Sequence, residues 1–138
     1  AGRENRGEGL RAKMRYLFYI LLWVIPNQCL SQSLITNTEL TKYQQSNEPL
    51  VIEFWADWND SNKCHFLSGL KDCRMYRICI EDYPDLAESY KINVLPTIIV
   101  FNKKEIIKTW KGDLLFKLDV DKQEIQAVID SIIISKFR

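Results

Sequence analysis

Residues 51–63 decide how the rest of the chain is interpreted, and they read Val-Ile-Glu-Phe-Trp-Ala-Asp-Trp-Asn-Asp-Ser-Asn-Lys. Residues 51–55 are mostly β-branched and aromatic, which is the composition of a buried strand. Residues 59–62 are Asn, Asp and Ser, which favour helix caps. The stretch therefore predicts a buried strand that ends in a sharp turn and leads into a helix.

Strand and helix patterns alternate along the rest of the chain. We expect strands at 34–35, 50–56, 74–80, 97–101 and 106–110, and helices at 38–43, 61–70, 82–90 and 124–134. The last helix is amphipathic, because its isoleucines and one valine recur at spacings of three and four. Such alternation predicts an α/β domain that contains parallel strands.

Two segments carry a resemblance to a known family. The stretch at 51–63 resembles the active-site segment of thioredoxins, with Asn59 and Asn62 standing where that family has its two cysteines. Pro96, followed by Thr97, resembles the family's cis-proline before a strand, and Gly112 matches the glycine after the return strand. The resemblance covers about residues 34–134 and implies a thioredoxin-like α/β fold, with a central mixed β-sheet flanked by helices.

The two asparagines bear directly on function. A redox thioredoxin needs one thiol that attacks a disulfide and a second that resolves the mixed disulfide. Asparagine has no nucleophilic sulfur, so we expect a redox-inactive domain and lean against an enzyme. The resemblance implies that such a domain binds an extended protein segment without a cofactor, in a groove lined by six residues: Trp58, Asn59, Asn62, Leu95, Pro96 and Gly112.

Two other functions stay open. Cys64 lies two positions after Asn62, and an atypical oxidoreductase or isomerase could use this thiol alone. A purely structural role in a larger assembly, with the groove unused, is the third hypothesis. The only histidine, His65, is adjacent to Cys64, and neighbours on a helix point about 100° apart. We therefore expect no catalytic Cys–His pair, and the clustered residues predict no metal site.

Glu53 interrupts the apolar strand, and alternation places its side chain on the same face as Val51 and Trp55. The resemblance implies a buried acid at this position beneath the active-site turn, with Arg77 as the basic residue on the next strand. Because an isolated buried carboxylate is costly, we expect either a Glu53–Arg77 ion pair or a protonated carboxyl. An inherited structural pair and a general acid/base role are both open.

Residues 112–121 depart from the family by several extra residues, of which Leu114, Phe116, Leu118 and Val120 alternate with other side chains. The alternation predicts a strand. Such a ribbon would either enlarge a protein-binding surface or fold back over the core. We weigh the two interpretations equally.

The N-terminal region is typical of an export signal. Residues 1–13 predict a disordered leader or a cloning remnant, and residues 14–32 predict a signal peptide with Arg15, an apolar run at 16–25 and a polar end. Ten residues span about half of a bilayer core as a helix, so cleavage is favoured over a retained anchor. We expect a domain at 33–138 that is exported to a bacterial periplasm or secreted, with no membrane span after cleavage.

Charge and cysteine content exclude some partners and pairings. The net charge of +1 does not indicate the basic surface that nucleic-acid binding requires, so we expect a protein partner. Cleavage leaves Cys64, Cys73 and Cys79, an odd number for an exported chain. Cys73 with Cys79, and Cys64 with Cys73, are predicted to lie too far apart for a disulfide, whereas Cys64 with Cys79 stays open.

Overall fold

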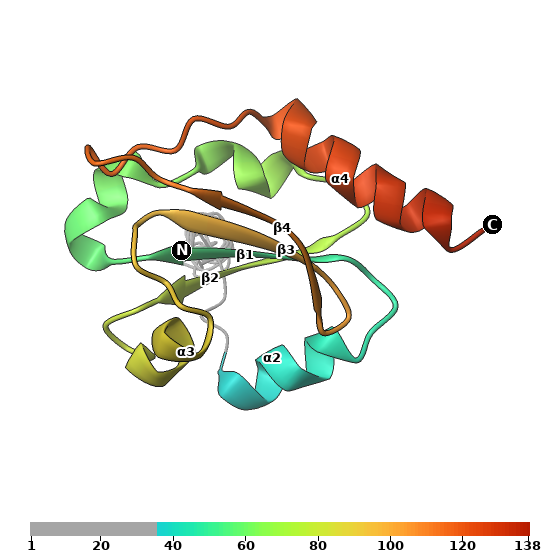
Figure 1. Ribbon diagram of the computed structural model, residues 1–138, viewed down its shortest axis with the longest axis horizontal. Helices are drawn as coiled ribbons and strands as arrows, with labels where there is room; N and C mark the ends of the chain where they lie inside the picture. The colour runs from blue at the N-terminus through green and yellow to red at the C-terminus, as the bar shows by residue number, and fades with distance from the viewer. Residues whose placement is uncertain (1–35) are drawn as a thin grey trace, which may run out of the picture. The chain divides into compact units, whose positions relative to one another are not determined.

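A four-stranded mixed sheet organises residues 36–138, the part of the chain that the computed structural model describes (Figure 1). The strands are β1 (Leu50–Trp55), β2 (Arg74–Cys79), β3 (Thr97–Asn102) and β4 (Glu105–Lys111), in the order β2-β1-β3-β4. β1 pairs parallel with β2 and antiparallel with β3, which pairs antiparallel with β4. The α/β class with a mixed sheet is therefore confirmed.

Helices cover both faces of this sheet (Figure 1). On one face, α2 (Asn37–Gln44) and α3 (Pro84–Ser89) contribute Leu40 and Leu86 to a core that includes Ile52 and Phe54. On the other face, α4 (Lys122–Ser135) packs its buried isoleucines against a second core that includes Val51. Because successive strand residues point to opposite faces, β1 supplies both cores and is buried along nearly its whole length.

Local sequence explains where the α-helices begin. Thr36 caps α2 in a reciprocal capping box with Glu39. Asp121 caps α4 by accepting a hydrogen bond from the Glu124 N–H. Pro84 occupies the first turn of α3, where its fixed φ and missing N–H carry no penalty.

The α-helix predicted at 61–70 is wrong. Two 3₁₀ segments take its place, η1 (Asp57–Asn62) and η2 (His65–Gly69), separated by Lys63 in an extended conformation with ψ of 148°. The Asp, Asn and Ser side chains of η1 compete with the backbone for hydrogen bonds and disfavour a long helix. The Cys64 N–H donates to the buried Glu53 carboxylate rather than to a helical carbonyl.

The strand predicted over residues 114–120 is also wrong. Asp113 accepts hydrogen bonds at its Oδ1 from the backbone N–H groups of Leu115 (2.8 Å) and Lys117 (3.0 Å), which curls the chain into a closed loop. The Asp113 N–H also donates to the Lys117 carbonyl (2.8 Å). The loop divides the apolar residues, since Leu118 and Val120 pack against the second core whereas Leu114 is 96% exposed and Leu115 is 69% exposed.

Three expectations fall on residues outside the described range: the leader at 1–13, the signal peptide at 14–32 and the strand at 34–35. Within residues 36–138, no helix has the length and apolar character that crossing a bilayer requires.

Candidate functional site

The turn after β1 brings the two asparagines together. Asn62 Nδ2 donates to Asn59 Oδ1 at 2.7 Å, and Asn59 Nδ2 donates to the carbonyl oxygen of Phe116 at 3.4 Å. Asn59 is buried, whereas Asn62 is partly exposed. The turn is therefore closed by amide hydrogen bonds and lies under the loop that joins β4 to α4.

The cis-proline segment leads into β3, which pairs with β1. The Leu95–Pro96 peptide bond is cis, and the Gly112 N–H donates to the Pro96 carbonyl at 2.8 Å. A Cβ on Gly112 would lie 2.7 Å from the Leu95 carbonyl oxygen, so a side chain does not fit at this position. Leu95 and Pro96 are buried.

The six predicted groove residues differ in exposure, and direct contacts join Asn59 to Asn62 and Gly112 to Leu95 and Pro96. Trp58 is 58% exposed, and Asn62 and Gly112 are partly exposed. Asn59, Leu95 and Pro96 are buried and offer little surface to a partner.

A buried ion pair lies beneath the turn. Arg77 Nε donates to Glu53 Oε2 at 2.7 Å, and the Cys64 N–H donates to Glu53 Oε1 at 3.0 Å. The Arg77 guanidinium also lies 4.0 Å above the ring of Trp55, and its Nη1 is 3.8 Å from Asp60 Oδ1. Glu53 is fully buried, and both of its oxygens accept a hydrogen bond. The carboxylate therefore connects β1 to β2 and to the start of η2.

Two side-chain donors around this ion pair lack a hydrogen-bond acceptor within residues 36–138. They are Arg77 Nη2 and Trp55 Nε1, and both atoms are buried. The Arg77 guanidinium stacks on the Trp55 indole, which brings together the two residues that carry these donors.

Cys64 is the thiol nearest to the asparagine turn, and its surroundings suppress its reactivity. Burial, the negative charge of Glu53 and a hydrogen bond to Glu53 raise the pKa of the Cys64 thiol to about 12, against a partial lowering by Arg77. Reactive cysteines have the opposite environment, namely a lowered pKa near positive charge.

The remaining predicted residues are the other two cysteines and the histidine. The three cysteines of residues 36–138 are free thiols, and burial with nearby Asp72 and Glu48 raises the pKa of Cys73 to about 11. His65 is exposed on η2.

Sequence reasoning missed a cluster at the carboxyl ends of β1 and β2. The Asp57 and Glu81 carboxylates and the Cys79 thiol lie within 4.8 Å of one another. The Asp57 N–H donates to Glu81 Oε2 at 3.2 Å, and the Cys79 thiol lies 3.8 Å from the same oxygen. Hydrophobic patterning does not reveal this cluster; only the parallel pairing of β1 with β2, which brings the residues after both strands to one edge of the sheet, could have found it.

An exposed aromatic contact adjoins this edge. The rings of Trp58 and Phe116 meet edge to face, with centroids 5.0 Å apart and an interplanar angle of 82°. Phe116 is 42% exposed and has a positive φ of 58°, which is uncommon for a bulky residue. With Leu114 and Leu115, these two residues form what we call the apolar knob: Trp58, Leu114, Leu115 and Phe116.

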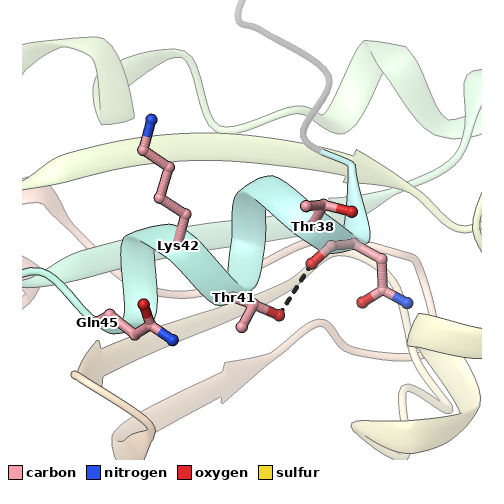
Figure 2. Close-up of a pocket in the computed structure, with 5 residues that line it drawn as sticks. Thr38, Thr41, Lys42 and Gln45 are labelled. Carbon is pink, nitrogen blue, oxygen red and sulfur yellow. Dashed lines mark hydrogen bonds between the residues drawn. The ribbon is translucent and has the colours of Figure 1, made fainter.

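Residues 36–138 also contain surface hollows. Figure 2 shows one on α2, of about 530 Å³, lined by Asn37, Thr38, Thr41, Lys42 and Gln45. Thr41 Oγ1 donates to the Asn37 carbonyl at 3.1 Å, a bond within the helix. The lining pairs no nucleophile with a base, so we assign no chemistry to it.

Known proteins of similar fold include thioredoxins. A mutant thioredoxin from Halobacterium salinarum NRC-1 superposes with a TM-score of 0.57 at 21% identity, covering 72% of this chain and 87% of that chain. The domain has a thioredoxin-like fold. No protein-family model matches the sequence.

Curated proteins similar to the thioredoxin-like domain include chloroplastic thioredoxin Y1 of Arabidopsis thaliana, which is 32% identical over 96 residues. The match covers 63% of this chain and 52% of that protein. Monothiol glutaredoxin-S17 of Arabidopsis thaliana is 25% identical over 87 residues, covering 59% of this chain and 18% of that protein. The chain therefore spans about half or less of the length of these curated relatives.

Proposed function

We propose that the chain is a redox-inactive thioredoxin-like module that binds protein in an exported compartment, with a bacterial envelope favoured. The observation that carries the proposal is the amide contact at the turn after β1. Asn62 donates to Asn59 at 2.7 Å, at the two positions where the resemblance implies a pair of thiols. Amides can neither attack a disulfide nor resolve one.

The environment of Cys64 counts against the alternative of a one-thiol oxidoreductase. With a pKa of about 12, about one Cys64 thiol in 10⁵ is ionised at pH 7. The side chain is buried, and its N–H is tied to Glu53. A thiolate that forms this rarely and lies below the surface is a poor nucleophile toward a folded substrate.

The apolar knob supports protein binding. Monomeric proteins rarely expose contiguous large apolar side chains without a partner. Here two leucines and two aromatic residues are exposed beside the closed turn. The proposed compartment rests on the apolar run at residues 16–25 alone, and N-terminal sequencing of the protein from the periplasm would test it.

Reduction of insulin disulfides by the purified domain tests the loss of redox activity. The domain is compared with Cys64→Ser and with an Asn59→Cys/Asn62→Cys variant, which serves as a positive control for the assay. We expect no turnover by the first two proteins and slow labelling of Cys64 by iodoacetamide at pH 7.

A different pattern would overturn the proposal. If the unmodified domain forms a mixed disulfide with a thiol-reactive substrate and Cys64→Ser abolishes it, the chain is a one-thiol redox protein.

A further inference from the structure

We infer that the apolar knob and the neighbouring carboxylates of Asp57 and Glu81 form one docking surface for a protein segment that carries an arginine or lysine next to apolar residues. The inference rests on the proposed function as a protein-binding module and adds the chemistry of the partner. Three features of the surface carry it: a rigid support, an exposed apolar area, and an uncompensated pair of negative charges.

The rigid support is the loop that begins at Asp113. Its carboxylate accepts two backbone N–H groups, and a third bond, from the Phe116 N–H to the Asp113 carbonyl at 3.0 Å, closes the loop further. Leu114 and Leu115 project from this hydrogen-bonded loop. Because the loop is already ordered, a partner that contacts it loses little additional conformational entropy on binding.

The apolar area extends from the loop to the turn after β1. Phe116 touches Trp58 edge to face, and its carbonyl accepts the Asn59 amide, so the loop and the turn form one continuous surface. Figure 1 shows the β4–α4 connection running beside the green segment that follows β1. Aromatic and leucine side chains on an ordered support are typical anchors for a protein partner.

The charged edge is joined to this area through the backbone, because Asp57 and Trp58 are consecutive residues at the start of η1. The Asp57 and Glu81 carboxylates approach within 4.8 Å, and the Asp57 N–H holds Glu81 in place. Neither acid forms an ion pair within residues 36–138, whereas nearby Asp60 is paired with Lys63. Two close carboxylates repel each other and are complementary to one cation.

A guanidinium suits this edge better than a neutral or acidic group. Its planar fork can donate to two carboxylate oxygens at once, and its weak hydration lowers the cost of burying it beside apolar side chains. The surface thus favours partners in which arginine adjoins leucine, valine or an aromatic residue, and it disfavours acidic segments by repulsion.

Selection of short random peptides displayed on phage against the immobilised domain tests this inference. We expect enriched peptides that carry arginine or lysine beside apolar residues. An Asp57→Asn/Glu81→Gln variant should bind a synthetic enriched peptide about tenfold more weakly or worse, because it loses charge-assisted contacts. Raising the salt concentration should weaken binding to the unmodified domain.

Matched controls remove equal charge or equal apolar surface elsewhere. Glu88→Gln/Glu105→Gln neutralises two exposed acids away from the knob and should leave affinity unchanged. Leu114→Ser/Leu115→Ser should abolish binding, whereas Ile134→Ser, at another exposed apolar position on α4, should not. Thermal melts of every variant verify that the fold is intact.

Three results would overturn the inference. Enrichment of neutral or acidic peptides, or an unchanged affinity of the Asp57→Asn/Glu81→Gln variant, leaves the proposed protein-binding function standing but removes the basic partner. No enrichment at all rejects the knob as a docking surface, while the insulin assay still decides redox activity separately. Stoichiometric Zn²⁺ binding that this variant abolishes would make the acidic edge a metal site instead.

Discussion

Replacing Arg77 by methionine is the perturbation whose effect the structure defines best. The change keeps an apolar stem against Trp55 but removes the charge that Glu53 faces at 2.7 Å. Glu53 is fully buried, so its remaining hydrogen-bond donor would be the neutral N–H of Cys64. The variant therefore contains a buried carboxylate without a counter-ion.

Breaking one side of a buried ion pair costs about 3–5 kcal/mol of folding free energy. With a urea slope of about 1–2 kcal/mol per molar, the unfolding midpoint of Arg77→Met should fall by about 1.5–5 M. The double variant Glu53→Gln/Arg77→Met should be more stable than Arg77→Met, because a neutral amide costs less to bury than a charge and still accepts the Cys64 N–H.

Urea denaturation followed by tryptophan fluorescence at pH 7 measures these midpoints. Arg74→Met is the matched control, since Arg74 pairs with Glu48 on the exposed end of β2 and its loss should change the midpoint little. A loss below about 1 kcal/mol in Arg77→Met, or a double variant less stable than the single one, would refute a charge-compensating role for Arg77.

Three further outcomes follow from single positions. The raised pKa of Cys64 means that its contribution to stability is complete below about pH 9 and is lost as pH rises toward about 12, where the folded thiol ionises. Cys64→Ala should therefore flatten the loss of stability of the domain between about pH 9 and pH 12 in urea titrations; a slope equal to that of the unmodified domain would contradict a buried, neutral thiol. Gly112→Ala should cost about 1–3 kcal/mol in the same assay, because its Cβ would meet a backbone carbonyl, whereas the Cβ of Gly69→Ala would meet the flexible end of a lysine and should cost less. Asp113→Ala should cost about 1 kcal/mol and speed hydrogen exchange of the two loop amides that its carboxylate binds; unchanged exchange rates would show that the loop is held by other contacts.

The sequence predicts the strands and the α-helices well because their signals are local or periodic. The apolar run of β1 and the isoleucines of α4 report burial directly. The cis geometry at Pro96 followed from a resemblance to a family, not from the residues alone. The signals of β1 and α4 depend on side chains near one another in the chain, so the sequence alone is enough to predict these two elements.

The errors arise where a particular side-chain hydrogen bond, or the register between two strands, overrides what hydrophobic patterning predicts. The helix expected at 61–70 breaks because Glu53, eleven residues earlier, takes the Cys64 N–H. The strand expected at 114–120 fails because one carboxylate, that of Asp113, binds two backbone amides and curls the chain. The acidic edge at Asp57 and Glu81 needs the register of β1 against β2, which hydrophobic patterning does not reveal.

The division between η1 and η2 has a mechanical consequence. A single α-helix leading away from the turn would act as a stiff rod, rising about 1.5 Å per residue, and would transmit a displacement at Asn59 toward the far side of the domain. Lys63, in an extended conformation, ends the first helical segment, η1, after six residues. A displacement of the turn at Asn59 is therefore not passed along a continuous helix toward Gly69, so the turn is mechanically separated from η2 and from the core contacts beyond it.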